Sequence, residues 1–268
     1  MPSDAKTLFR EGQLDAALEA QVAVVRDNPN DPEARALLSD LQCFTGALDK
    51  ADRQLDLLST QHTKLAVAVA QSRQLIRAAM ARQEVFEKGR APDLATEPDA
   101  FITSALQALL AWREGRAAEA KAILDEAESK REKVPGTRDG KAFDDFRDAD
   151  DLCAGFVEIL STTGKYFWVP THRVDFIEFE KTQRPRDLLW RQATVEVRGG
   201  PEGVVFIPAT YPMTPSGPEA TALRLGRATN WSTDADGPVR GIGQRMFLAG
   251  EEGVGMDEIT AVRFGSGS

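Results

Sequence analysis

The densest group of residues with reactive potential lies in one acidic stretch and comprises Asp144, Asp145, Asp148, Asp150 and Asp151. Carboxylates gathered in this way can hold a divalent cation or act as a general acid and base. Acidic residues also gather at the start of helices, where the helix dipole stabilises them. The apolar spacing that follows predicts a last helix over about residues 148–161, with the acids as its solvated N-terminal cap. A metal site at this stretch is the alternative interpretation.

Nucleophilic and metal chemistry find little support elsewhere in the chain. No Gly-x-Ser-x-Gly elbow is present, and Cys153 with His172 is only a pairing of rare residues. Cys43 and Cys153 are far apart and fit two reduced, buried thiols better than a disulfide. With only two histidines, a metal site of the usual His/Cys kind is disfavoured. We therefore predict no catalytic residue, no metal and no cofactor, and a protein that is not an enzyme.

Aromatic and arginine residues are better candidates for a functional surface, because Trp, Tyr and Arg are enriched at binding interfaces. They also fill domain junctions, where arginines pair with acids. An Asp-to-Arg network between the end of the helical half and the strand half is therefore the alternative to a binding site. The candidate binding or domain-junction residues are Arg147, Asp148, Asp150, Asp151, Tyr166, Trp168, Arg186, Asp187, Trp190, Arg191, Trp231 and Arg245.

The overall composition excludes several classes of protein. The chain has 268 residues, 42% of them hydrophobic, and a formal net charge of −9, which disfavours general affinity for nucleic acid or anionic membranes. No window approaches the ~18 consecutive apolar residues of a membrane span. The N-terminus leads directly into an amphipathic segment and not into a signal-peptide core. The sequence therefore predicts a cytoplasmic protein that binds neither nucleic acid nor membrane.

The N-terminal half of the chain, which must help to position these residues, contains a repeated sequence segment. The segment Gly12–Leu18 recurs at Gly46–Ala51 and again at Gly115–Ala120. The first interval is roughly the 34-residue period of tetratricopeptide repeats, and the second is about two further periods. Each glycine suits a turn between two helices, and the alanine five residues later suits a close helix contact. Stacked hairpins of this kind present a continuous surface to a helical or extended partner.

Helical spacing continues to about Lys130 and includes a long helix from Leu65 to Lys88 that Gly89 ends. After Gly164 the period falls to two, as in Val174–Phe179, with a hairpin loop at 198–203. We predict an α+β fold in which a tetratricopeptide-like α-α superhelix precedes a small, mostly antiparallel, barrel-like β domain. The predicted units are a repeat domain (1–135), an acidic linker with the last helix (136–163) and a β-rich domain (164–268).

The sequence resembles the ImpE family, also called SciE or TagJ, over nearly its whole length. The tetratricopeptide half is the less specific part, because many unrelated scaffolds share it. The most specific motifs lie in the second half of the chain. They are Phe146–Asp151, Gly164–Pro170, Pro185–Arg191, Pro208–Tyr211, Leu225–Trp231 and Gly241–Arg245.

The resemblance implies a non-enzymatic adaptor of a bacterial type VI secretion system. It implies binding of the N-terminal helical segment of the small subunit of the contractile sheath, and association with the ClpV-type ATPase that disassembles contracted sheaths. A helix could lie in the groove of stacked hairpins through apolar anchors at i, i+3, i+4 and i+7. Two alternatives stay open: a ligand-binding, metal-binding or catalytic β domain, and a purely structural scaffold joined by an Asp–Arg network.

Overall fold

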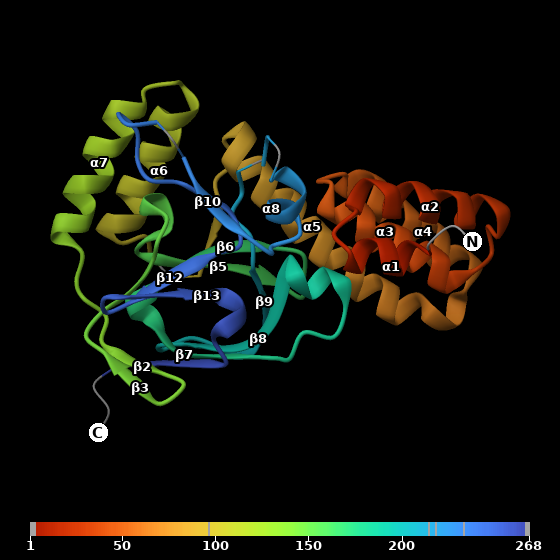
Figure 1. Ribbon diagram of the computed structural model, residues 1–268. Helices are drawn as coiled ribbons and strands as arrows, with labels where there is room; N and C mark the ends of the chain where they lie inside the picture. The colour runs from red at the N-terminus through yellow and green to blue at the C-terminus, as the bar shows by residue number, and fades with distance from the viewer. Residues whose placement is uncertain (1–3, 96, 214, 218, 233, 266–268) are drawn as a thin grey trace.

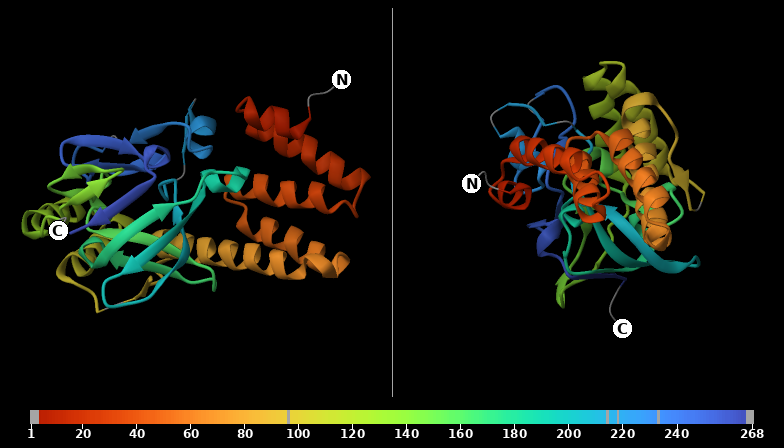
Figure 2. Two further views of the ribbon diagram at one scale, coloured as in Figure 1. Left: turned by 90° about the horizontal axis from the view of Figure 1, so that it is seen from below. Right: turned by 90° about the vertical axis from the view of Figure 1, so that its right-hand side faces the viewer.

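The structure is a computed structural model that describes residues 4–95, 97–213, 215–217, 219–232 and 234–265. Its helices are α1 (Ala5–Arg10), α2 (Leu14–Asp27), α3 (Pro32–Phe44), α4 (Leu48–Gln61), α5 (Ala66–Lys88), α6 (Ala100–Arg113), α7 (Ala117–Lys130) and α8 (Ala220–Arg224). Helices α1–α4 form an arm that projects from a sheet-rich body, and α5 extends from the arm onto the sheet (Figures 1 and 2). None of the helices in these described ranges is long and apolar enough to span a membrane.

The three sequence echoes are helical hairpins, as predicted. Gly12, Gly46 and Gly115 each lie in the turn between two helices, with left-handed φ values of 81°, 73° and 77°. A residue with a Cβ adopts this conformation only at an energetic cost. The alanines that follow these glycines are fully buried where paired helices touch; they are Ala17, Ala51 and Ala120, each 0% exposed. The membership of these hairpins in the tetratricopeptide class stays a prediction.

The repeat domain predicted over residues 1–135 stays a prediction, and its helices lie in two groups. Helices α1–α5 pack in sequence against one another, but the hairpin α6–α7 lies at the other end of the sheet-rich body (Figure 1). Gly89 ends α5 with a φ of 80°, and the short strand Asp93–Leu94 then pairs in parallel with residues Phe167–Trp168. This pairing carries the chain along the edge of the sheet before α6 begins.

The strands form one large sheet and two small ones. The nine-stranded sheet has the order β1-β6-β5-β9-β8-β7-β14-β2-β3, and the smaller sheets are β13-β12-β4 and β10-β11. The strands are β1 (Asp93–Leu94), β2 (Gly136–Arg138), β3 (Lys141–Phe143), β4 (Phe146–Asp148), β5 (Phe156–Ser161), β6 (Tyr166–Pro170), β7 (Val174–Phe179), β8 (Trp190–Val197), β9 (Glu202–Pro208), β10 (Thr229–Trp231), β11 (Gly241–Gly243), β12 (Met246–Ala249), β13 (Glu252–Gly255) and β14 (Ala261–Phe264).

The pairing of these strands is mostly antiparallel, as predicted. The expected hairpin at 198–203 joins β8 to β9, with Val195 opposite Gly203 and Trp190 opposite Pro208. Only the β1–β6 pair among the described strands is parallel. Because the large sheet has two ends, at β1 and β3, it is open in the described residues, and the barrel-like closure is not confirmed. The α+β class itself agrees with the sequence prediction.

The predicted helix over 148–161 is wrong. Asp148 ends β4, a single 3₁₀ turn covers Asp151–Cys153, and β5 occupies Phe156–Ser161. Residues 156–160 are all buried because both faces of β5 are covered. A strand buried on both faces shows no alternation of polar and apolar residues, so its apolar run also satisfies helical spacing.

A large hydrophobic cluster connects the arm to the sheet. It runs from Phe9 in α1 through α5 to Trp168, Trp190 and Leu225, while a second cluster fills the other face of the sheet. The division into 1–135, 136–163 and 164–268 remains a prediction, but strands β2–β5 place residues 136–161 within the sheets and not in a linker.

Candidate functional site

Glu158 lies at the centre of a buried ionic network between α5 and the sheet. Strand alternation turns Glu158 of β5, and Tyr166 and Trp168 of β6, toward α5. Arg82 of α5 donates to the Glu158 carboxylate from Nε at 2.6 Å and from Nη2 at 3.1 Å. The Tyr166 hydroxyl donates to it at 2.5 Å and itself accepts from the Trp168 indole at 2.6 Å. The Glu158 carboxylate is therefore removed from water, and Arg82 retains only 9% exposure.

Arg245 extends the network from Glu158 to the acidic stretch. Its Nη2 contacts Glu158, and its Nη1 lies 3.1 Å from Oδ2 of Asp148. The Tyr211 hydroxyl donates to Asp148 at 2.9 Å and also accepts from the Met246 amide. Arg245 and Asp148 are 1% and 3% exposed, so this second pair is also desolvated.

A third pair completes the arrangement. Arg240 Nε lies 2.9 Å from the Asp150 carboxylate, and the amides of Leu152 and Gly241 donate to the same group at 2.9 Å. Asp150 is 0% exposed and Arg240 is 2% exposed. The interpretation of the acidic stretch as a solvated helix cap is therefore wrong for Asp148 and Asp150. Both serve as buried partners of arginines from the C-terminal part of the chain.

The charges of the network shift the pKa values of its acids in opposite directions. Burial alone would raise the pKa of Glu158, but the guanidiniums of Arg82 and Arg245 lower it to about 2. Burial raises the pKa of Asp148 to about 7, because Arg245 offsets desolvation only in part and Asp150 adds repulsion. Glu158 is thus held ionised, whereas Asp148 takes up a proton near neutral pH.

Five of the predicted candidate residues meet in this network, and the others lie apart from it. Those that meet are Asp148, Asp150, Tyr166, Trp168 and Arg245. Arg147 and Asp151 form a half-buried pair 3.8 Å apart at its edge, and Asp151 also accepts from the Val239 amide. Trp231 packs 5.9 Å from the Tyr211 ring, centroid to centroid.

The motif Pro185–Arg191 lies outside the buried ionic network. Arg186 lies 3.9 Å from Asp40 of α3, and burial raises the pKa of that carboxyl to about 6 against the attraction of Arg186. Asp187 accepts from the amides of residues 183 and 184. Arg191 donates to the carbonyls of Met256 and Ile259, so the expected ion pairs of Arg186 and Arg191 with the acidic stretch do not form.

Sequence reasoning missed four members of the network: Arg82, Glu158, Tyr211 and Arg240. The clearest available signal was Glu158, a lone acid in the apolar run Phe156–Leu160, because a buried charge requires a partner. Arg227 of the Leu225–Trp231 motif donates to the carbonyls of Phe9 and Arg10 at 3.0 Å. It therefore fastens the end of α1 to the sheet-rich body.

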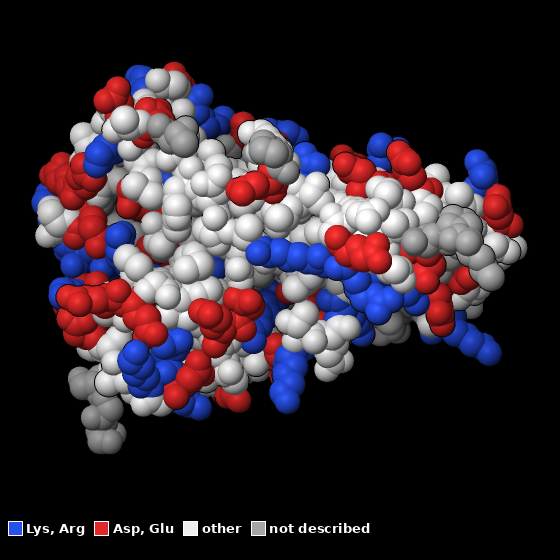
Figure 3. All heavy atoms as spheres, viewed as in Figure 1, with Lys and Arg blue, Asp and Glu red and all other residues white. Residues whose placement is uncertain are grey.

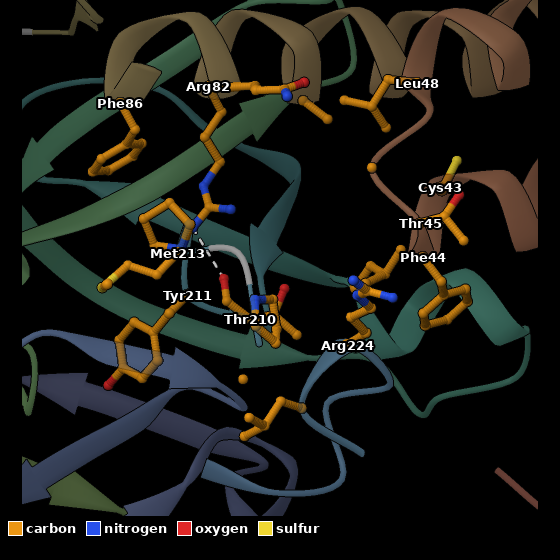
Figure 4. A pocket seen from close by; sticks show the side chains of 18 of the residues that line it. Cys43, Phe44, Thr45, Leu48, Arg82, Phe86, Thr210, Tyr211, Met213 and Arg224 are labelled. Atoms are coloured by element: carbon orange, nitrogen blue, oxygen red, sulfur yellow. Dashed lines mark hydrogen bonds between the residues drawn. The ribbon is translucent and has the colours of Figure 1, made fainter. Parts of the chain in front are cut away.

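A cleft borders the network at Arg82 and Tyr211, where the arm meets the sheet (Figure 4). We call it the junction cleft; its volume is about 190 Å³. The end of α3, one face of α5, the segment after β9 and α8 line it. Arg82 and Tyr211 belong to both the network and the cleft, and Trp190 forms part of a wall. The motif residues therefore shape a cavity that solvent can reach.

Two further hollows lie on the surface. A polar cleft of about 290 Å³ separates α5 from the segment 180–187 and includes Arg186, Asp187 and Arg191 in its lining. A larger hollow of about 760 Å³ runs along α1, α2 and α3, and we call it the α1–α3 groove. Charged side chains of both signs are mixed over the face in Figure 3, with no continuous basic surface on that face.

The metal interpretation of the acidic stretch gains no support. In the described part of the chain no group of three or more His, Cys, Asp or Glu residues is placed to hold a metal ion. Asp148 and Asp150 are engaged by arginines, and Asp145 accepts from Arg131 at 2.6 Å. The free thiols of Cys43 and Cys153 are buried, as predicted.

Fold and site together define an α+β protein whose helical arm is fixed to an open sheet by buried ion pairs, with clefts and a groove suited to binding. A protein-family model described as "ImpE protein" matches residues 140–263 of this chain. Type VI secretion system accessory component TagJ of Pseudomonas aeruginosa is 31% identical over 249 residues, covering 92% of this chain and 86% of TagJ. The chain belongs to the ImpE family. A crystal structure of a Vibrio parahaemolyticus protein superposes with a TM-score of 0.91 at 26% identity and 98% coverage of both chains.

Proposed function

We propose that this protein is a non-enzymatic accessory component of a bacterial type VI secretion system, and that the α1–α3 groove binds a helical segment of the sheath small subunit. The observation that carries the proposal is the similarity to TagJ over 92% of the chain. The family resemblance adds a ClpV-type ATPase as the second partner, and the proposal places all three proteins in the cytoplasm. No particular surface is assigned to the ATPase.

The shape of the α1–α3 groove suits a helix. The apolar part of its lining consists of small or aliphatic side chains, which let a guest helix approach closely; they are Ala5, Ala20, Ala23, Val24, Ala34 and Leu37. Gln21 donates to the Ala34 carbonyl at 2.7 Å and so fixes the spacing of α2 and α3. Val24 is 41% exposed, which leaves an apolar anchor available to a partner.

The rim of the groove is acidic. Asp4, Asp27, Asp31 and Glu33 line it, with Lys6 as the single base in that lining. Asp4 and Asp31 also cap helices, accepting from the amides of Thr7 and Glu33. Charge complementarity therefore favours a guest helix with one apolar face flanked by lysine or arginine.

Calorimetry with a peptide from the N-terminus of the sheath small subunit tests this proposal. Val24 and Val22 form a matched pair, because both are exposed on α2 but only Val24 lines the groove. Val24→Ser should weaken binding about 10-fold through the lost apolar contact, and Val22→Ser should leave it unchanged. Added salt should weaken binding through the acidic rim. Absence of binding up to millimolar peptide, or equal effects of the two substitutions, would refute the proposal.

A further inference from the structure

The lining of the junction cleft contains two guanidinium groups, that of Arg82 beside Thr210 and that of Arg224 beside Phe44 (Figure 4). Arg82 is 9% exposed, and its Nε and Nη2 bind Glu158 and the Thr210 carbonyl. Its Nη1 has no hydrogen bond to any residue that the structure describes. The guanidinium of Arg224, from α8, lies on the opposite wall, and it has neither a hydrogen bond nor an ion pair within the described residues. Nη1 of Arg82 is thus a hydrogen-bond donor that the contacts of Nε and Nη2 hold in place. Arg224 adds a positive charge that has no partner among the described residues.

The remaining walls are apolar and aromatic. Phe44, Leu48, Phe86, Trp190 and Met213 surround the space between the two arginines. A volume of about 190 Å³ accommodates one aromatic ring or branched aliphatic group, since an engineered cavity of ~150 Å³ holds benzene. The space is smaller than the pockets of ~300 Å³ or more that take larger ligands such as nucleotides.

One acid also borders the cleft. Glu87 lies at the exposed rim, where its carboxylate accepts from Gln83 Nε2 at 3.2 Å. Arg82 is balanced by Glu158, so Arg224 supplies the net charge inside while Glu87 remains near solvent. This polarity favours a ligand whose anionic end points inward, between the arginines.

We propose that the junction cleft is a binding site for a carboxylate attached to a compact apolar group. Nη1 of Arg82 and the planar fork of Arg224 bind the two carboxylate oxygens, and the aromatic walls enclose the apolar group. The C-terminal residue of a protein partner and a free small acid both have this chemistry. The site is separate from the α1–α3 groove, so it is independent of the function proposed above.

The test is titration of the full-length protein with matched probes, followed by calorimetry and by NMR of the tryptophan indoles. The probes are 3-phenylpropionate, its uncharged amide, N-acetyl-Ala-Phe with a free or an amidated C-terminus, and inorganic phosphate. We expect the free acids to bind at least about 10-fold more tightly than their amides, as a charge-assisted hydrogen bond implies. The Trp190 indole signal should shift with binding, and the Trp112 signal should not.

Arg224→Gln should reduce the affinity for the free acids about 10-fold, to that of the amides. Arg77→Gln is the matched control, because Arg77 is exposed on α5 outside the lining of the cleft. Tighter binding of the peptide acid than of 3-phenylpropionate would support the site with a protein C-terminus as its ligand, and the reverse order would support it with a small acid. Equal affinity of acids and amides, an unchanged affinity in Arg224→Gln, or saturation by phosphate alone would overturn the proposal. Sheath-peptide binding in Arg224→Gln should match the wild type, which separates this test from that of the groove.

Discussion

Replacing Glu158 by Gln tests whether the buried network holds the arm on the sheet. Gln keeps the shape of the side chain, so no cavity forms, but it leaves Arg82 buried without a countercharge while Arg245 retains Asp148. Removing one partner of a buried pair costs about 3–5 kcal/mol. The fall in the pKa of Glu158 from 4.5 to about 2 gives a similar figure, roughly 3 kcal/mol.

Urea unfolding, followed by circular dichroism and tryptophan fluorescence, measures this loss. Domain stabilities are about 5–15 kcal/mol, so Glu158→Gln should lower the unfolding midpoint strongly. The matched control is Glu126→Gln, which breaks a pair with Lys130 whose side chains are 69% and 70% exposed. That surface change should cost less than about 0.5 kcal/mol. A loss below about 1 kcal/mol for Glu158→Gln would show that the network contributes little to stability.

The pH dependence of the same variant gives an independent check. The folded-state pKa of Glu158 is lower than its unfolded value, so its contribution is complete above pH 4.5 and disappears as the pH falls toward 2. Wild type and Glu158→Gln should therefore converge in stability on acidification. A constant difference between pH 2 and pH 7 would contradict the assigned ionisation.

Three further substitutions address other parts of the structure. Asp148 has its pKa raised from 3.8 to about 7, so its contribution to stability is complete below pH 3.8 and is lost as the pH rises through 7. Between pH 4 and pH 8, the free energy of unfolding of Asp148→Asn should rise by roughly 2–4 kcal/mol relative to that of the wild type in unfolding titrations. The same pH dependence of stability in both proteins would contradict this. Arg227→Ala removes two hydrogen bonds to the last carbonyls of α1, and hydrogen exchange in α1 should accelerate by about 10-fold or more, with the exposed Arg198→Ala as control. Gly243→Ala places a Cβ 2.3 Å from a backbone oxygen at a φ of 85°, whereas Gly46→Ala meets nothing within 4 Å. Thermal melts should therefore show a larger loss for Gly243→Ala than the roughly 1–3 kcal/mol of backbone strain expected for Gly46→Ala, and equal losses would refute the packing argument.

The helices were predictable because their signals are local. Gly89 ends α5, as predicted. Asp31 followed by Pro32 is a local signal of a helix start, and Asp31 caps α3 by accepting from the amides of Glu33 and Ala34. The location of the third hairpin was not predictable in this way. It depends on the pairing of β1 with β6, which joins segments far apart in the sequence and gives no periodic pattern.

The candidate site was predictable in its residue types but not in its pairings. Asp148 and Asp150 were expected in a network with Arg186 and Arg191, and Arg245 was named only as a candidate binding or domain-junction residue; the structure buries Asp148 and Asp150 with Arg240 and Arg245 instead. Their partners depend on how β4, β11 and β12 come together, so Arg240 could not be chosen from its local sequence. Glu158 was missed because β5 was assigned to a helix, and with it the contact to Arg82 across the sheet was lost.

Helix α5 sets the angle between the arm and the sheet, because one end packs on α4 and the other on β5 and β6. Each residue added to a helix turns everything beyond it by about 100° and moves it by about 1.5 Å. A single-residue insertion in the middle of α5 would rotate the arm away from Arg227. It would also widen or close the junction cleft between the arm and the sheet. Insertions of seven residues, about two turns, would nearly restore the original direction. Relatives with arms of the same orientation should therefore conserve the length of this helix more strictly than its exposed residues.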